Sequence, residues 1–146
     1  SEMCIRDSTK AAGLYMICTL SKHEAEKQGY TDSLMLDHEG YIAEATGANI
    51  FFKDKDGTLH TPIPDSFLDG ITRRTVIEIA NSKNIKVNER KIKPEELKNF
   101  VGCFLTGTAA EVTPVSQIDK FNYKVCNTII QLSESYQQTV RKKKAA

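Results

Sequence analysis

Residues 33–62, SLMLDHEGYIAEATGANIFFKDKDGTLHTP, constrain the fold more than any other part of the chain. Short apolar runs in this segment are separated by residues 37–40 (DHEG) and 54–57 (DKDG), whose Asp and Gly residues are typical of tight turns. Short strands joined by such turns form hairpins. The segment therefore predicts a meander of short strands.

A helix is predicted before the meander, over residues 10–28. Leu14, Ile17 and Ala25 fall on one face of it, the charged residues collect at its far end, and Gly29 follows as a stop signal.

Helices and strands alternate after the meander. A helix that opens near Ile71 and Thr72 is expected to bury Val76, Ile79 and Ala80. The elements expected after it are a strand over residues 85–92, a short helix beginning near Pro94, a buried strand over residues 103–107 and an amphipathic helix over about residues 125–141. Short strands interleaved with helices predict an α/β or α+β domain.

Charge and hydropathy exclude several classes of protein. The chain of 146 residues has a net charge of +1, so no overall field attracts nucleic acid or an acidic membrane. The basic run at residues 141–144 is expected to be a solvated helix end. No apolar run approaches the ~20 residues that span a bilayer. We expect one cytoplasmic domain without nucleic-acid or membrane partners.

The cysteine and histidine spacings indicate no metal site. The cysteines form no C-x-x-C pair, which favours reduced, buried thiols; they are Cys4, Cys18, Cys103 and Cys126. The histidines stand alone in polar or turn-like contexts and are expected to be exposed; they are His23, His38 and His60.

One candidate anion site is Gly70-Ile71-Thr72, where a glycine directly precedes a predicted helix. The amides of a first helical turn point outward, and the helix dipole adds partial positive charge there. A phosphate binds such amides, and the Thr72 hydroxyl is a further donor. The alternative is that Thr72 only caps the helix and Gly70 only makes a turn.

A second candidate is the bare, small-residue turn at residues 106–110 (TGTAA), between two strand-like runs. Gly107 between two threonines offers consecutive amides and two hydroxyls with no bulky side chain in the way, which suits phosphate or carboxylate. The alternative is an ordinary tight turn. Two such cradles in one small domain favour a single phosphorylated ligand.

Lys10 and Glu44 are candidates for chemistry. If Lys10 is buried, its pKa falls, as an imine-forming lysine requires; otherwise it is an ordinary solvated lysine. Strand alternation puts Glu44 on the same face as Ile42, and an inward carboxylate needs a cationic or protonated partner.

Four blocks in this order, STKAAGLYM, GYIAEATGANIFF, FLDGITRRTV and FLTGTAAEVTPV, resemble the branched-chain amino acid aminotransferases, which are pyridoxal-phosphate enzymes of fold type IV. The likeness implies that residues 9–146 form that family's larger, C-terminal domain, a mixed sheet or partial barrel of short strands flanked by helices. Residues 1–8 match nothing expected there and are interpreted as a truncation or foreign residues, with the family's N-terminal domain missing.

The resemblance implies a role for each candidate around the cofactor ring. Lys10 matches the lysine that bonds covalently to the pyridoxal aldehyde and shuttles the proton. Tyr15 matches a tyrosine that hydrogen-bonds the phenolic oxygen and borders the substrate. Glu44 matches the carboxylate that keeps the pyridine nitrogen protonated, so that the ring accepts electrons from the substrate.

The resemblance also implies the phosphate and substrate contacts. Gly70, with the amides of Ile71 and Thr72 and the Thr72 hydroxyl, matches one half of the phosphate cradle. Gly107 and Thr108 match the other half, and Thr108 also borders the substrate. The amide of Ala109 matches a donor to the substrate carboxylate.

The implied reaction exchanges the amino group of L-leucine, L-isoleucine or L-valine with 2-oxoglutarate. We expect little turnover from this chain alone and a homodimer or hexamer of the complete protein. One alternative is a D-amino acid or amine transaminase, or an aminodeoxychorismate-lyase-like enzyme, within the same superfamily. The other is a non-enzymatic α/β binding domain in which Lys10 and Glu44 lie on the surface.

Overall fold

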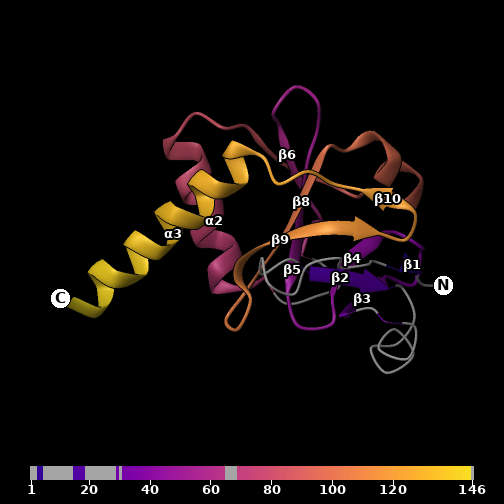
Figure 1. Ribbon diagram of the computed structural model, residues 1–146, viewed down its shortest axis with the longest axis horizontal. Helices are drawn as coiled ribbons and strands as arrows, with labels where there is room; N and C mark the ends of the chain where they lie inside the picture. The colour runs from indigo at the N-terminus through magenta and orange to yellow at the C-terminus, as the bar shows by residue number, and fades with distance from the viewer. Residues whose placement is uncertain (1–2, 5–14, 19–28, 30, 65–68, 146) are drawn as a thin grey trace.

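The computed structural model describes residues 3–4, 15–18, 29, 31–64 and 69–145, with the backbone alone for residues 3–4 and 15–18 (Figure 1). These residues form one mixed sheet, two α-helices and a 3-10 helix. The elements are β1 (Met3–Cys4), β2 (Tyr15–Cys18), β3 (Asp32–Leu36), β4 (Ile42–Ala45), β5 (Asn49–Lys53), β6 (Leu59–Thr61), α2 (Ile71–Ser82), β7 (Val87–Glu89), η2 (Pro94–Asn99), β8 (Gly102–Gly107), β9 (Glu111–Ile118), β10 (Phe121–Asn122) and α3 (Asn127–Ala145).

The strand order is β4-β3-β1-β2-β9-β8-β5-β6-β7, with β10 on β9. Most neighbours are antiparallel, including β3 with β4, β5 with β6 and β8 with β9. The strand β2 runs parallel to both β3 and β9, and β6 runs parallel to β7. The predicted meander of short strands and the predicted α/β class with a mixed sheet are confirmed.

The helix predicted over residues 10–28 is wrong at residues 15–18, which form the strand β2. A four-residue apolar run is compatible with either structure, and here pairing decides between them. Ile17 is opposite Asp32 of β3 on one side and Ile118 of β9 on the other. Residues 10–14 and 19–28 lie outside the described part of the chain.

Both faces of the sheet carry apolar side chains, so the central strands do not alternate between apolar and polar residues. On one face the rings of Phe51 and Phe104 stack with their centroids 4.9 Å apart. On the other face Phe52 stacks on Phe100, at 4.8 Å. Successive residues of β5 and β8 thus enter opposite clusters.

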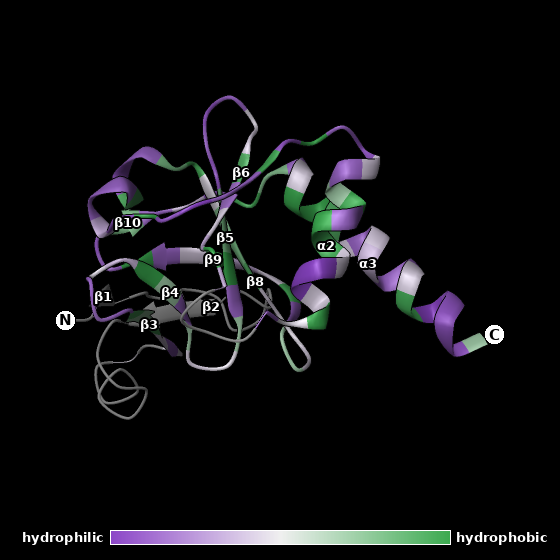
Figure 2. Cartoon of the chain, turned by 180° about the vertical axis from the view of Figure 1, so that it is seen from behind, coloured by the Kyte–Doolittle hydropathy of each residue, from purple (hydrophilic) through white to green (hydrophobic). Residues whose placement is uncertain are grey.

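The helices α2 and α3 lie side by side against the Phe51 and Phe104 face (Figures 1 and 2). As predicted, α2 buries Val76 and Ala80 completely. Ile79 is only partly buried, because it lies at the edge of the same cluster. The helix α3 begins at Asn127 rather than at residue 125, and Ile129 is fully buried on its inner face.

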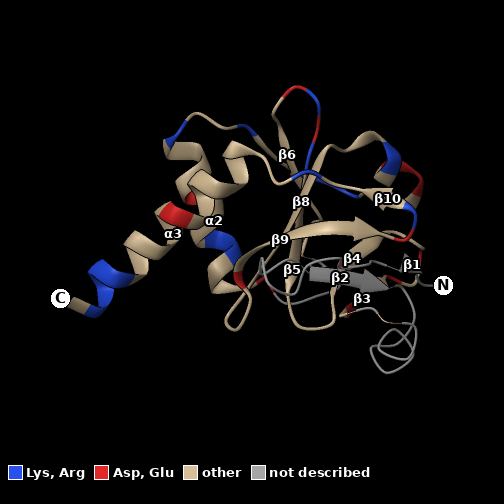
Figure 3. Cartoon of the chain, in the orientation of Figure 1, with Lys and Arg blue, Asp and Glu red and all other residues tan. Residues whose placement is uncertain are grey.

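The predicted solvated helix end is confirmed, since residues 141–144 are exposed in the last turn of α3 (Figure 3). Of the cysteines whose side chains are described, Cys103 is buried and Cys126 is half-buried. Burial raises the pKa of the Cys103 thiol, which keeps it protonated and unreactive. Among the described residues, neither helix is long and apolar enough to cross a membrane.

The prediction that the histidines are exposed is confirmed for His38 and wrong for His60, whereas His23 lies outside the described residues. The strand β6 turns His60 inward onto the Phe100 ring, 5.5 Å from centroid to centroid. Its Nε2 lies 2.7 Å from Asp54 Oδ2, and its Nδ1 accepts from Arg90 Nε at 3.1 Å. These partners satisfy both ring nitrogens, so a polar ring is buried without an unpaired atom.

The ion pair between Glu96 and Arg90, 2.7 Å from Oε1 to Nη2, predicts a pH dependence of stability. Hydrogen bonds from Arg90, opposed by burial and assisted by the Lys93 amide, hold the pKa of Glu96 below its ordinary value of 4.5. Such a carboxyl stabilises the fold above its unfolded pKa and loses that effect as pH falls through its folded pKa. We expect Glu96→Gln to lower the free energy of unfolding at neutral pH, with the deficit vanishing in acid, as measured by urea denaturation. The exposed neighbour variant Glu95→Gln is the control, and a deficit independent of pH would contradict this account.

Candidate functional site

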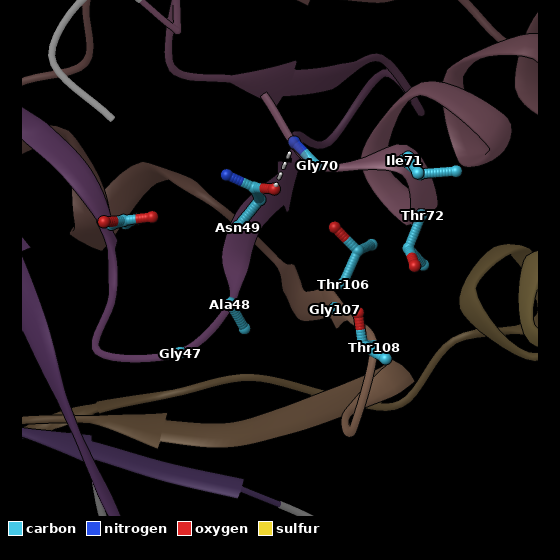
Figure 4. Close-up of a pocket in the computed structure, with 10 residues that line it drawn as sticks. Gly47, Ala48, Asn49, Gly70, Ile71, Thr72, Thr106, Gly107 and Thr108 are labelled. Carbon is cyan, nitrogen blue, oxygen red and sulfur yellow. Dashed lines mark hydrogen bonds between the residues drawn. The ribbon is translucent and has the colours of Figure 1, made fainter. Parts of the chain in front are cut away.

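A pocket of about 270 Å³ lies between the start of α2, the start of β5 and the turn after β8 (Figure 4). It combines both of the stretches that the sequence singled out as anion sites. The lining residues are Glu44, Gly47, Ala48, Asn49, Gly70, Ile71, Thr72, Thr106, Gly107 and Thr108. Residues from three separate parts of the chain therefore meet at one place.

The wall formed by α2 presents a helix N-terminus without a cap. Gly70 is the N-cap residue and is extended, with φ −67° and ψ 148°; among the described residues no side chain caps the helix, and its first turn holds no acidic residue. The alternative in which Thr72 caps the helix is therefore not observed. The first amides of an α-helix have no intrahelical acceptor. Together with the helix dipole, they make this wall a donor surface for an anion.

Thr72 is buried beside these amides, and its Oγ1 lies 3.4 Å from the hydroxyl of Tyr136 on α3. A hydroxyl can accept one hydrogen bond while donating another. If Tyr136 donates to Thr72, the Thr72 proton is left for a ligand in the pocket.

Asn49 holds the start of α2 in place. Its Oδ1 accepts a hydrogen bond from the Gly70 amide at 3.3 Å (Figure 4). The approach is so close that a Cβ at position 70 would lie 2.7 Å from that oxygen. A side chain at position 70 would therefore displace the Asn49 amide, although the φ of Gly70 is one that any residue adopts.

The opposite wall is the turn after β8. Gly107 lies close to the neighbouring loop, where an added Cβ would come within 3.1 Å of the Gly47 carbonyl oxygen. Thr108 is exposed at the pocket mouth. Ala109 is exposed one residue further on and does not line the pocket. The small residues of this turn thus let backbone and hydroxyl groups face the cavity.

Asn49 lines the pocket although no role was predicted for it from sequence, and Thr106 lines it as one of the two hydroxyls predicted for the TGTAA turn. They are opposite one another in the β5–β8 ladder. Each stands two residues from a phenylalanine of the helix-side cluster, Phe51 or Phe104, so both side chains share the face that α2 covers. Counting by twos from these phenylalanines is the sequence signal that would have placed both side chains on that face.

Glu44 lines the same pocket, on β4. Burial raises the pKa of its carboxyl above the ordinary value of 4.5. Among the described residues no cationic side chain forms an ion pair with it. A half-buried carboxylate in this state binds a cationic or protonated ligand group favourably.

Two further residues, Tyr15 and Lys10, were predicted from sequence to belong to the site. Tyr15 begins β2, where it is opposite Val115 of β9, and its side chain lies outside the description. Lys10 lies outside the described residues altogether.

The family profile described as Amino-transferase class IV matches residues 6–118. A relative from Rickettsia felis, named probable branched-chain-amino-acid aminotransferase, is 53% identical over 125 residues, covering 83% of this chain and 43% of the relative. The branched-chain amino acid aminotransferase of Thermobaculum terrenum, solved in its PLP form, matches with a TM-score of 0.78 and 38% identity over 83% of this chain and 41% of that one. The enzyme of Thermoproteus uzoniensis, solved with norvaline, has a TM-score of 0.77 and 38% identity over 82% and 40% of the two chains.

The chain belongs to the class IV aminotransferases. The resemblance inferred from the four sequence blocks is thereby confirmed, and so is the fold. The chain spans less than half the length of these relatives.

The contact between Gly70 and Asn49 predicts that Gly70→Ala destabilises the protein. The added methyl group displaces the Asn49 amide and breaks its hydrogen bond, so we expect a loss of about 1–2 kcal/mol in the free energy of unfolding by urea denaturation. Gly47→Ala is the matched control, because a Cβ at that position meets nothing within 4 Å. Equal stabilities of the two variants would show that the contact does not hold the start of α2.

Proposed function

We propose that the protein containing this chain is a pyridoxal-phosphate-dependent transaminase that moves the amino group between L-leucine, L-isoleucine or L-valine and 2-oxoglutarate. One observation carries the proposal. The uncapped start of α2 and the turn at Gly107 border one pocket that also receives the half-buried Glu44 carboxylate. The names of the relatives support the choice of branched-chain substrates.

The residues present fit this cofactor. Donor groups at Ile71 and Thr72 and on the turn at Gly107 suit a phosphate, and Glu44 in the same lining suits a protonated ring nitrogen. A Cβ at Gly70 or at Gly107 would crowd other residues of the pocket lining, Asn49 at 2.7 Å and Gly47 at 3.1 Å. The same pocket would be a poor site for a cation at its donor end.

Backbone amides and hydroxyls of this chain would bind the cofactor phosphate. The amides of Ile71 and Thr72, the Thr72 hydroxyl, Gly107 and Thr108 would hold the phosphate. When bound, the cofactor supplies a ring that accepts the electrons released as the Cα–H bond of the amino acid breaks.

Glu44 would hold the proton on the ring nitrogen and so keep that ring electron-poor. Lys10 would carry the covalent bond to the cofactor aldehyde and, once displaced by substrate, move the proton between the substrate Cα and the cofactor. Tyr15 would donate to the phenolic oxygen, and the Ala109 amide would bind the substrate carboxylate.

Further features of the complete protein are part of the proposal. Residues 9–146 would be the cofactor-binding domain of the family, with small amino acids and 2-oxo acids as ligands. The resemblance to branched-chain aminotransferases supports a homodimer or hexamer in the cytoplasm.

The test is to add pyridoxal phosphate to the full-length protein that contains this sequence. We expect a visible absorption band and, after borohydride reduction and peptide mapping, the label on Lys10. Label on Lys22 or Lys27 instead would overturn the assignment. Amino-group transfer from L-leucine but not from D-alanine separates the branched-chain enzyme from its superfamily alternatives, and the absence of any labelled lysine would favour a binding domain.

Glu44→Gln removes the charge opposite the ring nitrogen without changing side-chain size. We expect kcat to fall by about 10²-fold, because the negative charge stabilises the electron-poor ring in the transition state. Cofactor affinity is expected to fall much less. Glu39→Gln, on an exposed loop, is the control, and equal kcat values for the two variants would contradict the role of Glu44.

A further inference from the structure

The hydroxyl of Thr106 is a buried polar group without a partner among the described residues. Thr106 is fully buried, and its Oγ1 makes no hydrogen bond to any part of the chain that the structure describes. The residue lines the pocket, and Figure 4 shows its hydroxyl on the side of Asn49 and Gly70. Buried hydroxyls in native proteins are nearly always paired, so this one calls for a partner.

The groups around Thr106 decide what that partner is. Its neighbour across the ladder is Asn49, whose Oδ1 already accepts from the Gly70 amide. The amides of Ile71 and Thr72, on the facing wall, are donors. The Thr106 hydroxyl does not bond to Asn49 or to any other described residue, and an oxyanion would accept hydrogen bonds from this hydroxyl and from the amides at once.

We propose that Thr106 is a direct ligand of the cofactor phosphate, donating its hydroxyl to a phosphate oxygen from the sheet below the start of α2. The inference rests on the proposed function, and it adds the sheet as a third side of the cradle, besides α2 and the turn at Gly107 and Thr108. The strand thus contributes a rigidly held donor, whereas Thr108 contributes one from the exposed mouth of the pocket.

A purely structural threonine and a ligand threonine respond differently to loss of the hydroxyl. Thr61 is the matched control, because it is equally buried but its Oγ1 donates to the Ile50 carbonyl oxygen at 2.8 Å. Thr61→Val breaks a protein hydrogen bond, and we expect a lower melting temperature with unchanged phosphate affinity. Thr106→Val removes an unpaired hydroxyl, and we expect the cofactor-free protein to melt no lower than the wild type.

The affinities are measured on the full-length protein by titration with pyridoxal phosphate, pyridoxal and inorganic phosphate. We expect Thr106→Val to lower the affinity for pyridoxal phosphate and for inorganic phosphate by about 10- to 100-fold. This is the loss that corresponds to one charge-assisted hydrogen bond. Pyridoxal, which lacks the phosphate, is expected to bind unchanged. Thr106→Ser retains the hydroxyl and should restore the affinity for phosphate.

Equal phosphate affinity of wild type and Thr106→Val overturns the inference. So does a parallel loss of pyridoxal affinity, which would mean that the valine distorts the pocket as a whole. If Thr106→Val does not fold, Thr106→Ala and Thr106→Ser are compared in its place. We then expect only the Thr106→Ser variant to keep the wild-type affinity for phosphate. A wild type that binds inorganic phosphate through Thr106 but does not bind pyridoxal phosphate would refute the proposed function and leave the oxyanion site standing.

Discussion

The amides of the first turn of α2, which have no acceptor within the helix, are the constraint on which the rest of the site depends. A helix normally finds acceptors for its first amides in a capping side chain or in water. Here the N-cap is Gly70, and its own amide is tied to Asn49 on β5. The helix therefore begins over the end of a strand with its dipole directed into a pocket. An anion in that pocket would be stabilised both by the helix dipole and by hydrogen bonds from the amides.

The sheet makes this arrangement possible by bringing distant segments into register. The pairing of β5 with β8 places Asn49 opposite Thr106, and the stacked Phe51 and Phe104 behind them seat the helices on the same face. The buried Arg73 fixes α2 further, with Nη1 2.9 Å from Asp69 and Nη2 2.5 Å from Glu89 of β7. These contacts fix the position of the amides at the start of α2. Binding a ligand there would therefore cost little conformational entropy.

The sequence predicted local features of this protein better than those that depend on pairing. The turns at residues 37–40 and 54–57 and the helix at Ile71 were predictable because Asp, Gly and helical periodicity act over a few residues. Residues 15–18 were assigned to a helix because their strand conformation arises from two neighbours that are distant in sequence. Tertiary structure likewise decides that His60 is buried. It also decides which threonine of the TGT turn is buried and which is exposed. Both stretches that border the pocket were singled out from sequence, including the two hydroxyls of the TGT turn, but only the structure shows that Thr106 is the buried one.

The central claim is that the start of α2 and the turn after β8 hold one phosphate between them. The most direct measurement is a crystal structure of the full-length protein with pyridoxal phosphate. The account predicts phosphate oxygens within hydrogen-bonding distance of the Ile71 and Thr72 amides and of the turn at Gly107, with the cofactor ring nitrogen facing Glu44. A phosphate bound elsewhere, with the first turn of α2 contacting only water, would contradict it.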